Sequence, residues 1–119
     1  MRSVKILCIE DNETNISLMR RLATRNDHNL VSYRSAERAL ENFAVDQPHL
    51  IVIDYMLAGH ITGLDLVKIL RQQGHALPIV MASAYSDKKT ECLEAGCDVF
   101  IEKPIDIYRF FAILDSYTQ

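Results

Sequence analysis

The sequence has no apolar run of the length that crosses a lipid bilayer, about 20 residues. Its start is also a poor signal peptide, because acidic residues follow the short apolar segment at once in MRSVKILCIEDN (1–12). Basic residues are not in excess: 13 Lys and Arg stand against 16 Asp and Glu, which gives a net charge of −3. We therefore expect no membrane association and no direct binding of nucleic acid.

Cysteine is scarce, and its three residues show no metal-type spacing: Cys8, Cys92 and Cys97. An odd number of cysteines without such spacing favours free thiols in a reducing compartment, so we expect a cytoplasmic protein. Cys8 has apolar neighbours and is expected in the core. The histidines share no ligand spacing either, and we expect all four to be exposed in loops or at helix ends, at positions 28, 49, 60 and 75.

Two glycine-rich motifs that cradle nucleotide phosphates are absent, namely G-x-x-x-x-G-K-[ST] and G-x-G-x-x-G. The sequence also has no linker, internal repeat or low-complexity segment. Its 119 residues, 49% hydrophobic and 24% charged, suit one compact unit. We expect residues 1–119 to form a single domain.

Strand-like and helix-like segments alternate five times along the chain. Short apolar segments predict strands over 4–9, 29–33, 50–54, 78–82 and 98–102. Helical spacing predicts helices over 12–26, from Ser35 to before Pro48, from Thr62, over about 87–95 up to Gly96, and from Asp106. This alternation predicts an α/β fold, doubly wound, with parallel strands joined by right-handed helical crossovers and helices on both faces.

The segment LIVIDYMLA (50–58) runs from continuous apolar residues directly into Asp54. Continuous hydrophobicity is typical of a parallel strand that is buried on both faces. A carboxylate at the end of such a strand costs free energy unless a partner compensates it. Asp54 therefore marks the place where functional groups are to be sought.

In an open α/β sheet, ligands bind at the carboxyl ends of the strands. The residues expected there are Glu10, Asp11, Asp54, Ser83 and Lys103. Each has an ordinary explanation alone, such as capping of the first helix by the acidic pair. Together, three carboxylates suit Mg²⁺, and the lysine and hydroxyl suit the oxygens of a phosphoryl group. A carboxylate can itself be the nucleophile in phosphoryl transfer, and Asp54 is the best candidate.

With these residues in place, the chain closely resembles the receiver domain of two-component response regulators along essentially its whole length. The matching segments are CIEDN (8–12), LIVIDYML (50–57), PIVMASA (78–84) and VFIEKP (99–104). The resemblance implies a flavodoxin-like (βα)5 domain whose five parallel strands lie in the order 2-1-3-4-5. It also implies a function in phosphorelay signal transduction.

The resemblance implies that Asp54 accepts a phosphoryl group from a phosphohistidine of a sensor histidine kinase or a histidine phosphotransfer protein. Asp11, Asp54 and the backbone carbonyl of Met56 would bind Mg²⁺ directly, and Glu10 would act through a water. The protein would not be an enzyme in the usual sense, since it would promote only its own phosphorylation and dephosphorylation.

The remaining roles concern the response to phosphorylation. Lys103 would pair with the phosphate, the Lys103–Pro104 bond would be cis, and Ser83 would be the switch hydroxyl. Phe100 would rotate inward on activation, or else be a static packing residue. The surface of the fourth helix, fifth strand and fifth helix would then change for a downstream effector that the sequence does not identify.

Two features depart from the family pattern. Ala58 stands where the family often has proline, and the loop before Gly63 is about one residue longer, so the path of residues 57–63 is not predictable. Met56 and Tyr85 are large and uncharged at positions that influence water access, which predicts a long-lived phosphorylated form.

Two other functions compete with this one. An Mg²⁺-dependent hydrolase with an aspartyl-phosphate intermediate usually needs a second acid two residues after the nucleophile, where this chain has Met56. A receiver-like binding module that works without phosphorylation typically lacks an acid or the lysine, and this chain has all of them. The sequence does not show whether the chain acts alone or belongs to a hybrid kinase or a longer regulator.

Overall fold

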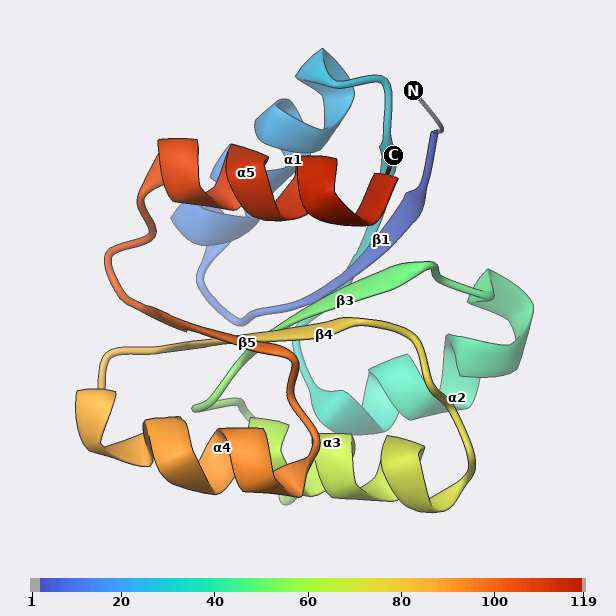
Figure 1. The fold of residues 1–119 in the computed structure, drawn as a ribbon. Coiled ribbons are helices and arrows are strands. Elements are labelled where there is room, and N and C mark those ends of the chain that lie inside the picture. Colours follow the sequence, from blue (N-terminus) through green and yellow to red (C-terminus); the bar gives the residue numbers. More distant parts are fainter. Residues whose placement is uncertain (1–2, 119) are drawn as a thin grey trace.

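A parallel five-stranded sheet forms the centre of the computed structural model, which describes residues 3–118. The strands are β1 (Lys5–Ile9), β2 (Asn29–Tyr33), β3 (Leu50–Asp54), β4 (Ile79–Ser83) and β5 (Val99–Glu102). They pair in parallel in the order β2-β1-β3-β4-β5 (Figure 1). The predicted strand order is confirmed, with strand bounds that differ from the predicted ones by at most one residue.

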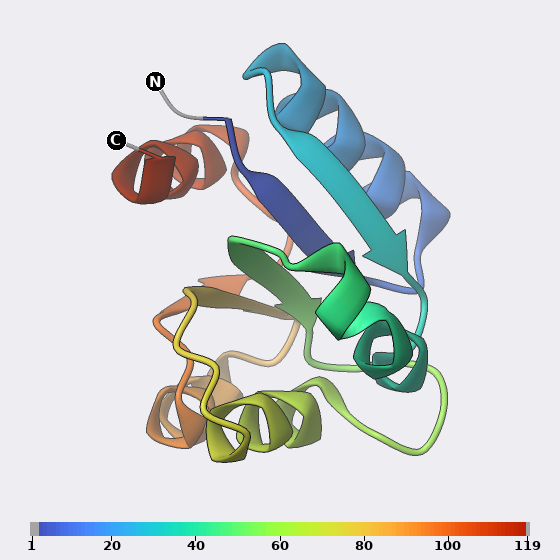
Figure 2. The same cartoon turned by 90° about the vertical axis from the view of Figure 1, so that its right-hand side faces the viewer.

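Helices cover both faces of this sheet: α1 (Glu13–Arg25), α2 (Ala36–Asp46), α3 (Gly63–Gln72), α4 (Lys89–Ala95) and α5 (Ile107–Thr118). Figure 1 shows α1 and α5 on one face and α2, α3 and α4 on the other, and Figure 2 shows the same layers after a quarter turn. Each face has its own buried cluster, one containing Met19 and Phe110 and the other containing Leu66 and Phe100. The doubly wound α/β class is therefore confirmed.

Side chains at the helix starts explain where the helices begin. The side chains of Ser35 and Thr62 accept hydrogen bonds from the backbone N–H three residues ahead, and Thr62 forms a reciprocal capping box with Asp65. Asp106 likewise accepts the N–H groups of Tyr108 and Arg109 before α5. Such caps satisfy N–H groups that have no partner inside the helix. The helix starts predicted at Ser35, Thr62 and Asp106 are confirmed, and each of these side chains caps its helix.

The fourth helix starts differently from the prediction. A 3₁₀ turn, η1 (Ser86–Lys88), precedes α4, and neither has a side-chain cap at its start. The end of α4 is as predicted, because Gly96 has φ of +122° and Cys97 donates its N–H to the Cys92 carbonyl. This closing pattern favours glycine, which tolerates positive φ. The helix thus has a firmly fixed end and a loosely fixed start.

The central strand is buried along its entire length, as the apolar run predicts. All three cysteines are buried free thiols, and burial raises the pKa of Cys8 and Cys97 to about 12. One prediction about histidine is wrong, since His28 is buried. Its Nδ1 accepts a hydrogen bond from the Val4 N–H at 3.1 Å, which satisfies a backbone group at the start of the sheet. No helix within residues 3–118 is long and apolar enough to span a membrane.

Candidate functional site

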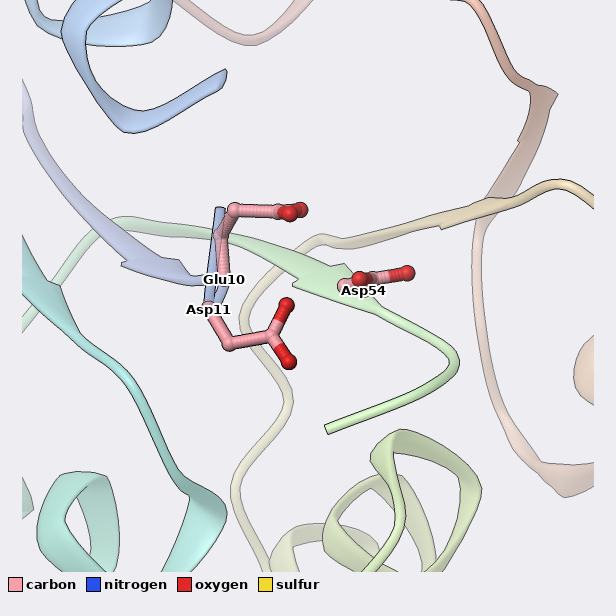
Figure 3. A group of neighbouring side chains, drawn as sticks. All are labelled: Glu10, Asp11 and Asp54. Carbon is pink, nitrogen blue, oxygen red and sulfur yellow. The ribbon is translucent and has the colours of Figure 1, made fainter. Parts of the chain in front are cut away.

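Three carboxylates meet at the carboxyl edge of the sheet, as expected. Glu10 and Asp11 directly follow β1, and Asp54 is the last residue of the neighbouring strand β3. The pairing of Ile9 with Ile53 brings the residues that follow them side by side. One carboxylate oxygen from each of the three acids lies within 4.8 Å of the others (Figure 3). Glu10 and Asp54 are buried, while Asp11 is half-buried.

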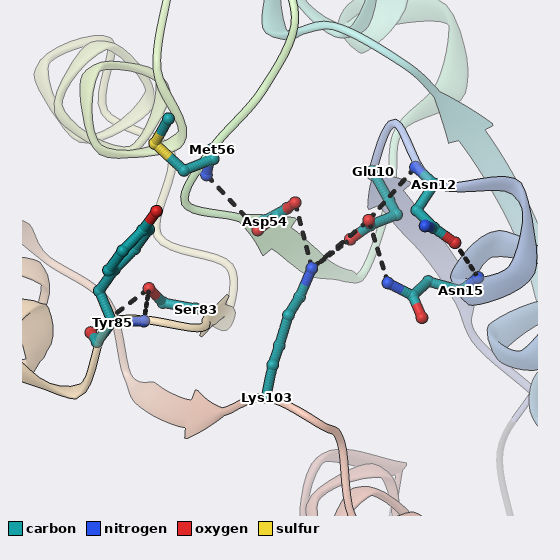
Figure 4. Close-up of polar contacts among 8 residues, drawn as sticks. All are labelled: Glu10, Asn12, Asn15, Asp54, Met56, Ser83, Tyr85 and Lys103. Atoms are coloured by element: carbon teal, nitrogen blue, oxygen red, sulfur yellow. Dashed lines mark hydrogen bonds and ion pairs between the residues drawn. The ribbon is translucent and has the colours of Figure 1, made fainter.

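Lys103 reaches this cluster from the segment that follows β5. Its Nζ lies 3.1 Å from Asp54 Oδ2 and 3.1 Å from Glu10 Oε2 (Figure 4). The backbone N–H of Lys103 donates to the Ser83 carbonyl at 2.8 Å, which holds the lysine in place. The Lys103–Pro104 peptide bond is cis, as the resemblance implies. One ammonium group therefore bridges two of the three carboxylates.

The lysine does not fully compensate the negative charge of the cluster. Burial, together with the charge of Glu10, raises the pKa of Asp54 even though Lys103 opposes the rise. Burial alone would lower the pKa of Lys103, but the carboxylates of Asp54 and Glu10 outweigh it and the pKa is raised. Three carboxylates and one ammonium leave a formal charge of −2, which a divalent cation would neutralise.

The donor set fits a hard divalent cation, because such ions prefer carboxylate oxygens gathered at short mutual distances. Glu10, Asp11 and Asp54 could therefore hold a metal ion. A fourth group lies close at hand, since the backbone of Met56 folds back towards Asp54 and its N–H donates to Asp54 Oδ1 at 3.4 Å.

Asn15 is a member of the site that the sequence prediction missed. Its Nδ2 donates to Glu10 Oε1 at 3.2 Å, and the Asn12 N–H donates to the same oxygen at 3.3 Å. Both bonds orient the Glu10 carboxylate beside Lys103. The signal in the sequence is the spacing: Asn15 is the third residue of the helix that Asn12 caps, which points it back at the end of β1.

The two residues expected to respond to phosphorylation are in place, but among residues 3–118 neither side chain forms a hydrogen bond to the carboxylates. Ser83 ends β4 and is buried, and its Oγ accepts the Tyr85 N–H at 2.9 Å (Figure 4). Within the described residues, no hydrogen bond joins Ser83 to Asp54. The Phe100 side chain is buried against the layer of α3 and α4.

Large side chains stand at the mouth of the site. Met56 and Tyr85 are 55% and 51% exposed, and Figure 4 shows them on the side of Asp54 opposite Glu10. The loop between β3 and α3 returns beneath Asp54 at Gly63. A Cβ at Gly63 would lie 2.3 Å from the Asp54 carbonyl oxygen, so only glycine fits there.

Known proteins share both the sequence pattern and the architecture. The profile of the response regulator receiver domain matches residues 6–115. The chain is 30% identical over 116 residues to the polar-differentiation response regulator DivK of Brucella ovis, and the match covers 94% of each chain.

Solved structures agree with this match. The BeF3-activated N-terminal receiver domain of Klebsiella pneumoniae RstA has a TM-score of 0.87 and 27% identity, over 97% of this chain and 98% of that one. The receiver domain of the Francisella response regulator 1452 shares the fold, with a TM-score of 0.90 and 24% identity over 98% and 97% of the two chains. The resemblance carried by the four motif segments is confirmed.

Proposed function

Because this chain belongs to the response regulator receiver domain family, whose members act in phosphorelay signalling, we propose that Asp54 is its phosphoacceptor. The observation that carries the proposal is the position of the Asp54 carboxylate. It lies at the end of the buried central strand, 3.1 Å from Lys103 and beside two further carboxylates. Residues 1–119 would form one receiver domain, and the cytoplasmic location remains a prediction.

The chemistry is an exchange of one bond for another. A carboxylate oxygen of Asp54 attacks the phosphorus of a phosphohistidine, the P–N bond breaks, and the histidine nitrogen leaves with its electron pair. Lys103 already lies beside Asp54 and offsets negative charge on the transferred oxygens. In this way the domain promotes only its own phosphorylation and the later hydrolysis of its acyl phosphate.

Asp11, Asp54 and the backbone carbonyl of Met56 would hold Mg²⁺, and Glu10 would act through a water. When bound, Mg²⁺ would offset the charge that develops on the phosphoryl oxygens. Asn15 would not bind the metal itself. Its hydrogen bond to Glu10 Oε1 keeps the Glu10 carboxylate turned towards the site.

The phosphodonor would be a sensor histidine kinase or a histidine phosphotransfer protein. An open groove of about 430 Å³ lies beside Lys103, between α1 and the segment after β5. Leu18 and Ile105 contribute apolar surface to it, and Asn15 and Lys103 connect it with the site. A donor seated in this groove would present its histidine next to Asp54.

Phosphorylation would change the surface formed by α4, β5 and α5. Ser83 would give up its hydrogen bonds to Tyr85 and bind a phosphoryl oxygen, and Phe100 would pack further inward. The uncapped start of η1 and α4 supports this proposal, because few local interactions oppose a shift of that end. Differential contacts of this kind can bias a two-state surface.

Labelling with acetyl phosphate and Mg²⁺ tests the phosphoacceptor. Intact mass measurement should show one added phosphoryl group on the wild-type chain and none on Asp54→Asn. Asp115→Asn, which changes an exposed carboxylate of α5, is the matched control and should be labelled normally. Continued labelling of Asp54→Asn would refute the assignment. Failure of beryllofluoride to bind the wild-type chain would favour a phosphorylation-independent binding module.

A further inference from the structure

The loop between β3 and α3 contains Ala58 in place of the usual proline and is about one residue longer than usual in the family. The structure shows which contacts fix its path. Near its end, Gly63 donates its N–H to the Tyr55 carbonyl at 3.1 Å. In its middle, Ala58 forms an isolated parallel bridge with Ser35, the residue that caps α2. Met56, whose carbonyl is the proposed metal ligand, lies between Tyr55 and Ala58, which make these two contacts.

Glu37 makes a third contact with the loop, two residues beyond Ala58. It lies in the first turn of α2, and its Oε2 accepts the His60 N–H at 2.8 Å. Hydrogen bonds from the backbone, first among them that of His60, lower the pKa of the Glu37 carboxyl. The side chain is therefore an anionic acceptor around which the loop is wrapped, and the positive end of the α2 dipole favours its charge.

Gly59 shows how closely the loop follows this carboxylate. Its φ is +93°, and a Cβ at this position would lie 2.8 Å from both carboxylate oxygens of Glu37. Glu37 Oε1 is buried in this contact. The backbone thus passes so close to the carboxylate that a side chain at position 59 would displace it.

We propose that Glu37 is a positioning residue for the metal site, which sets the path of residues 56–61 and so the placement of the Met56 carbonyl. In chains with proline after the phosphoacceptor, the ring restricts the backbone of this loop. Here Ala58 imposes no such restriction, and the hydrogen bond from His60 to Glu37 replaces it. The inference rests on the proposed function, because it assumes that the Met56 carbonyl binds Mg²⁺.

Direct titration of Mg²⁺, without any phosphodonor, tests the role. Glu37→Ala removes the acceptor and should weaken Mg²⁺ binding about tenfold, the low end of what outer-shell residues of metal sites contribute. Glu37→Gln keeps an acceptor oxygen, so its loss of Mg²⁺ affinity should be smaller than that of Glu37→Ala. Glu41→Gln removes the same charge one turn further along α2 and should stay within about twofold, since Glu41 is exposed and pairs only with Arg38.

Hydrogen exchange of the His60 amide tests the contact with Glu37 independently of the metal. The amide should exchange faster in Glu37→Ala than in the wild type and be unchanged in Glu41→Gln. Gly59→Ala should also weaken Mg²⁺ binding, and the double variant Glu37→Ala/Gly59→Ala should lose less than the product of the two single losses, because both changes act on one contact.

The outcomes separate this inference from the proposed function. If the wild-type chain takes up no Mg²⁺, the proposed metal site fails, and the positioning role fails with it. If the wild type binds Mg²⁺ but Glu37→Ala binds it equally well, only the positioning role is overturned. Equal losses in Glu37→Ala and Glu41→Gln would overturn it too, because they would show an effect of charge alone.

Discussion

Lys103 Nζ lies 3.1 Å from Asp54 Oδ2, yet this ion pair does not remove the cost of burying Asp54. Burial and the nearby Glu10 raise the pKa of Asp54 above its ordinary value of 3.8. Ionised Asp54 therefore destabilises the folded chain when no metal is bound. The protonated form of Asp54, in contrast, contributes stability. That stability is complete below the unfolded pKa and is lost as the pH rises through the folded pKa.

Asp54→Asn should for this reason stabilise the metal-free protein at pH 7. We expect a rise in Tm of about 4 °C, which corresponds to about 1 kcal/mol in a domain of this size. The gain should shrink on acidification, because wild-type Asp54 also becomes neutral as the pH falls through its raised pKa. Thermal denaturation in the presence of a chelator at several pH values measures it. A gain that grows on acidification would contradict the sign, and Asp115→Asn should show no such trend.

Ser83→Ala should separate phosphorylation from its consequences. The Ser83 hydroxyl bonds only to the Tyr85 backbone among the described residues, so its loss should leave the rate of labelling by acetyl phosphate within about threefold. The response of α4, β5 and α5 should fall by more than half, as measured by amide chemical-shift changes on adding beryllofluoride. An undiminished response would show that Ser83 is not the switch hydroxyl.

Met56 and Tyr85 should prolong the life of the phosphorylated form. Their exposed side chains stand at the mouth of the site and should restrict the approach of water to the acyl phosphate. Met56→Ala and Tyr85→Ala should each shorten the half-life about threefold, equivalent to about 0.65 kcal/mol. Loss of label from the purified phosphoprotein measures this, with Val45→Ala, an exposed apolar change in α2, as control. A half-life of seconds for the phosphorylated wild-type chain would contradict the predicted long-lived form.

Gly63→Ala should damage both stability and the site. The added Cβ would lie 2.3 Å from the Asp54 carbonyl oxygen, so the backbone of β3 or α3 must shift. We expect a loss of about 3 kcal/mol, in the range of severe overpacking. Gly74→Ala is the matched control: its Cβ would meet nothing within 4 Å, although its φ of +87° carries a strain of about 1 kcal/mol. Denaturant unfolding compares the two, and equal losses would show that the close approach at Gly63 is unimportant.

Much of the fold and site could be predicted because the signals are local. The apolar run that ends at Asp54 specifies a buried central strand, and the caps at Ser35 and Thr62 mark the starts of their helices. Since parallel strands all end at one edge of the sheet, the acids and Lys103 could be placed together before any coordinates.

The features that escaped prediction depend on contacts between segments far apart in the sequence. His28 was expected to be exposed, but it is buried because β1 begins beside it and supplies the Val4 N–H. The role of Glu37 was not predicted, since nothing in the sequence around it reveals that the loop after β3 returns to it. The 3₁₀ turn before α4 was not predicted either, and neither this turn nor α4 has a side-chain cap at its start.

The bond between Lys103 and Glu10 joins two residues that lie 93 positions apart in the sequence, one after the first strand and one after the last. A ribosome that has released β1 to β4 has made all three acids, but the lysine that completes the site comes only with the segment after β5. Until that segment has been made, the acids after β1 and β3 have no lysine partner, and under the proposed function the phosphoryl site is incomplete. Under the proposed function, phosphorylation therefore needs residues that follow the first and the last strand of the sheet, and the site cannot form before both are present.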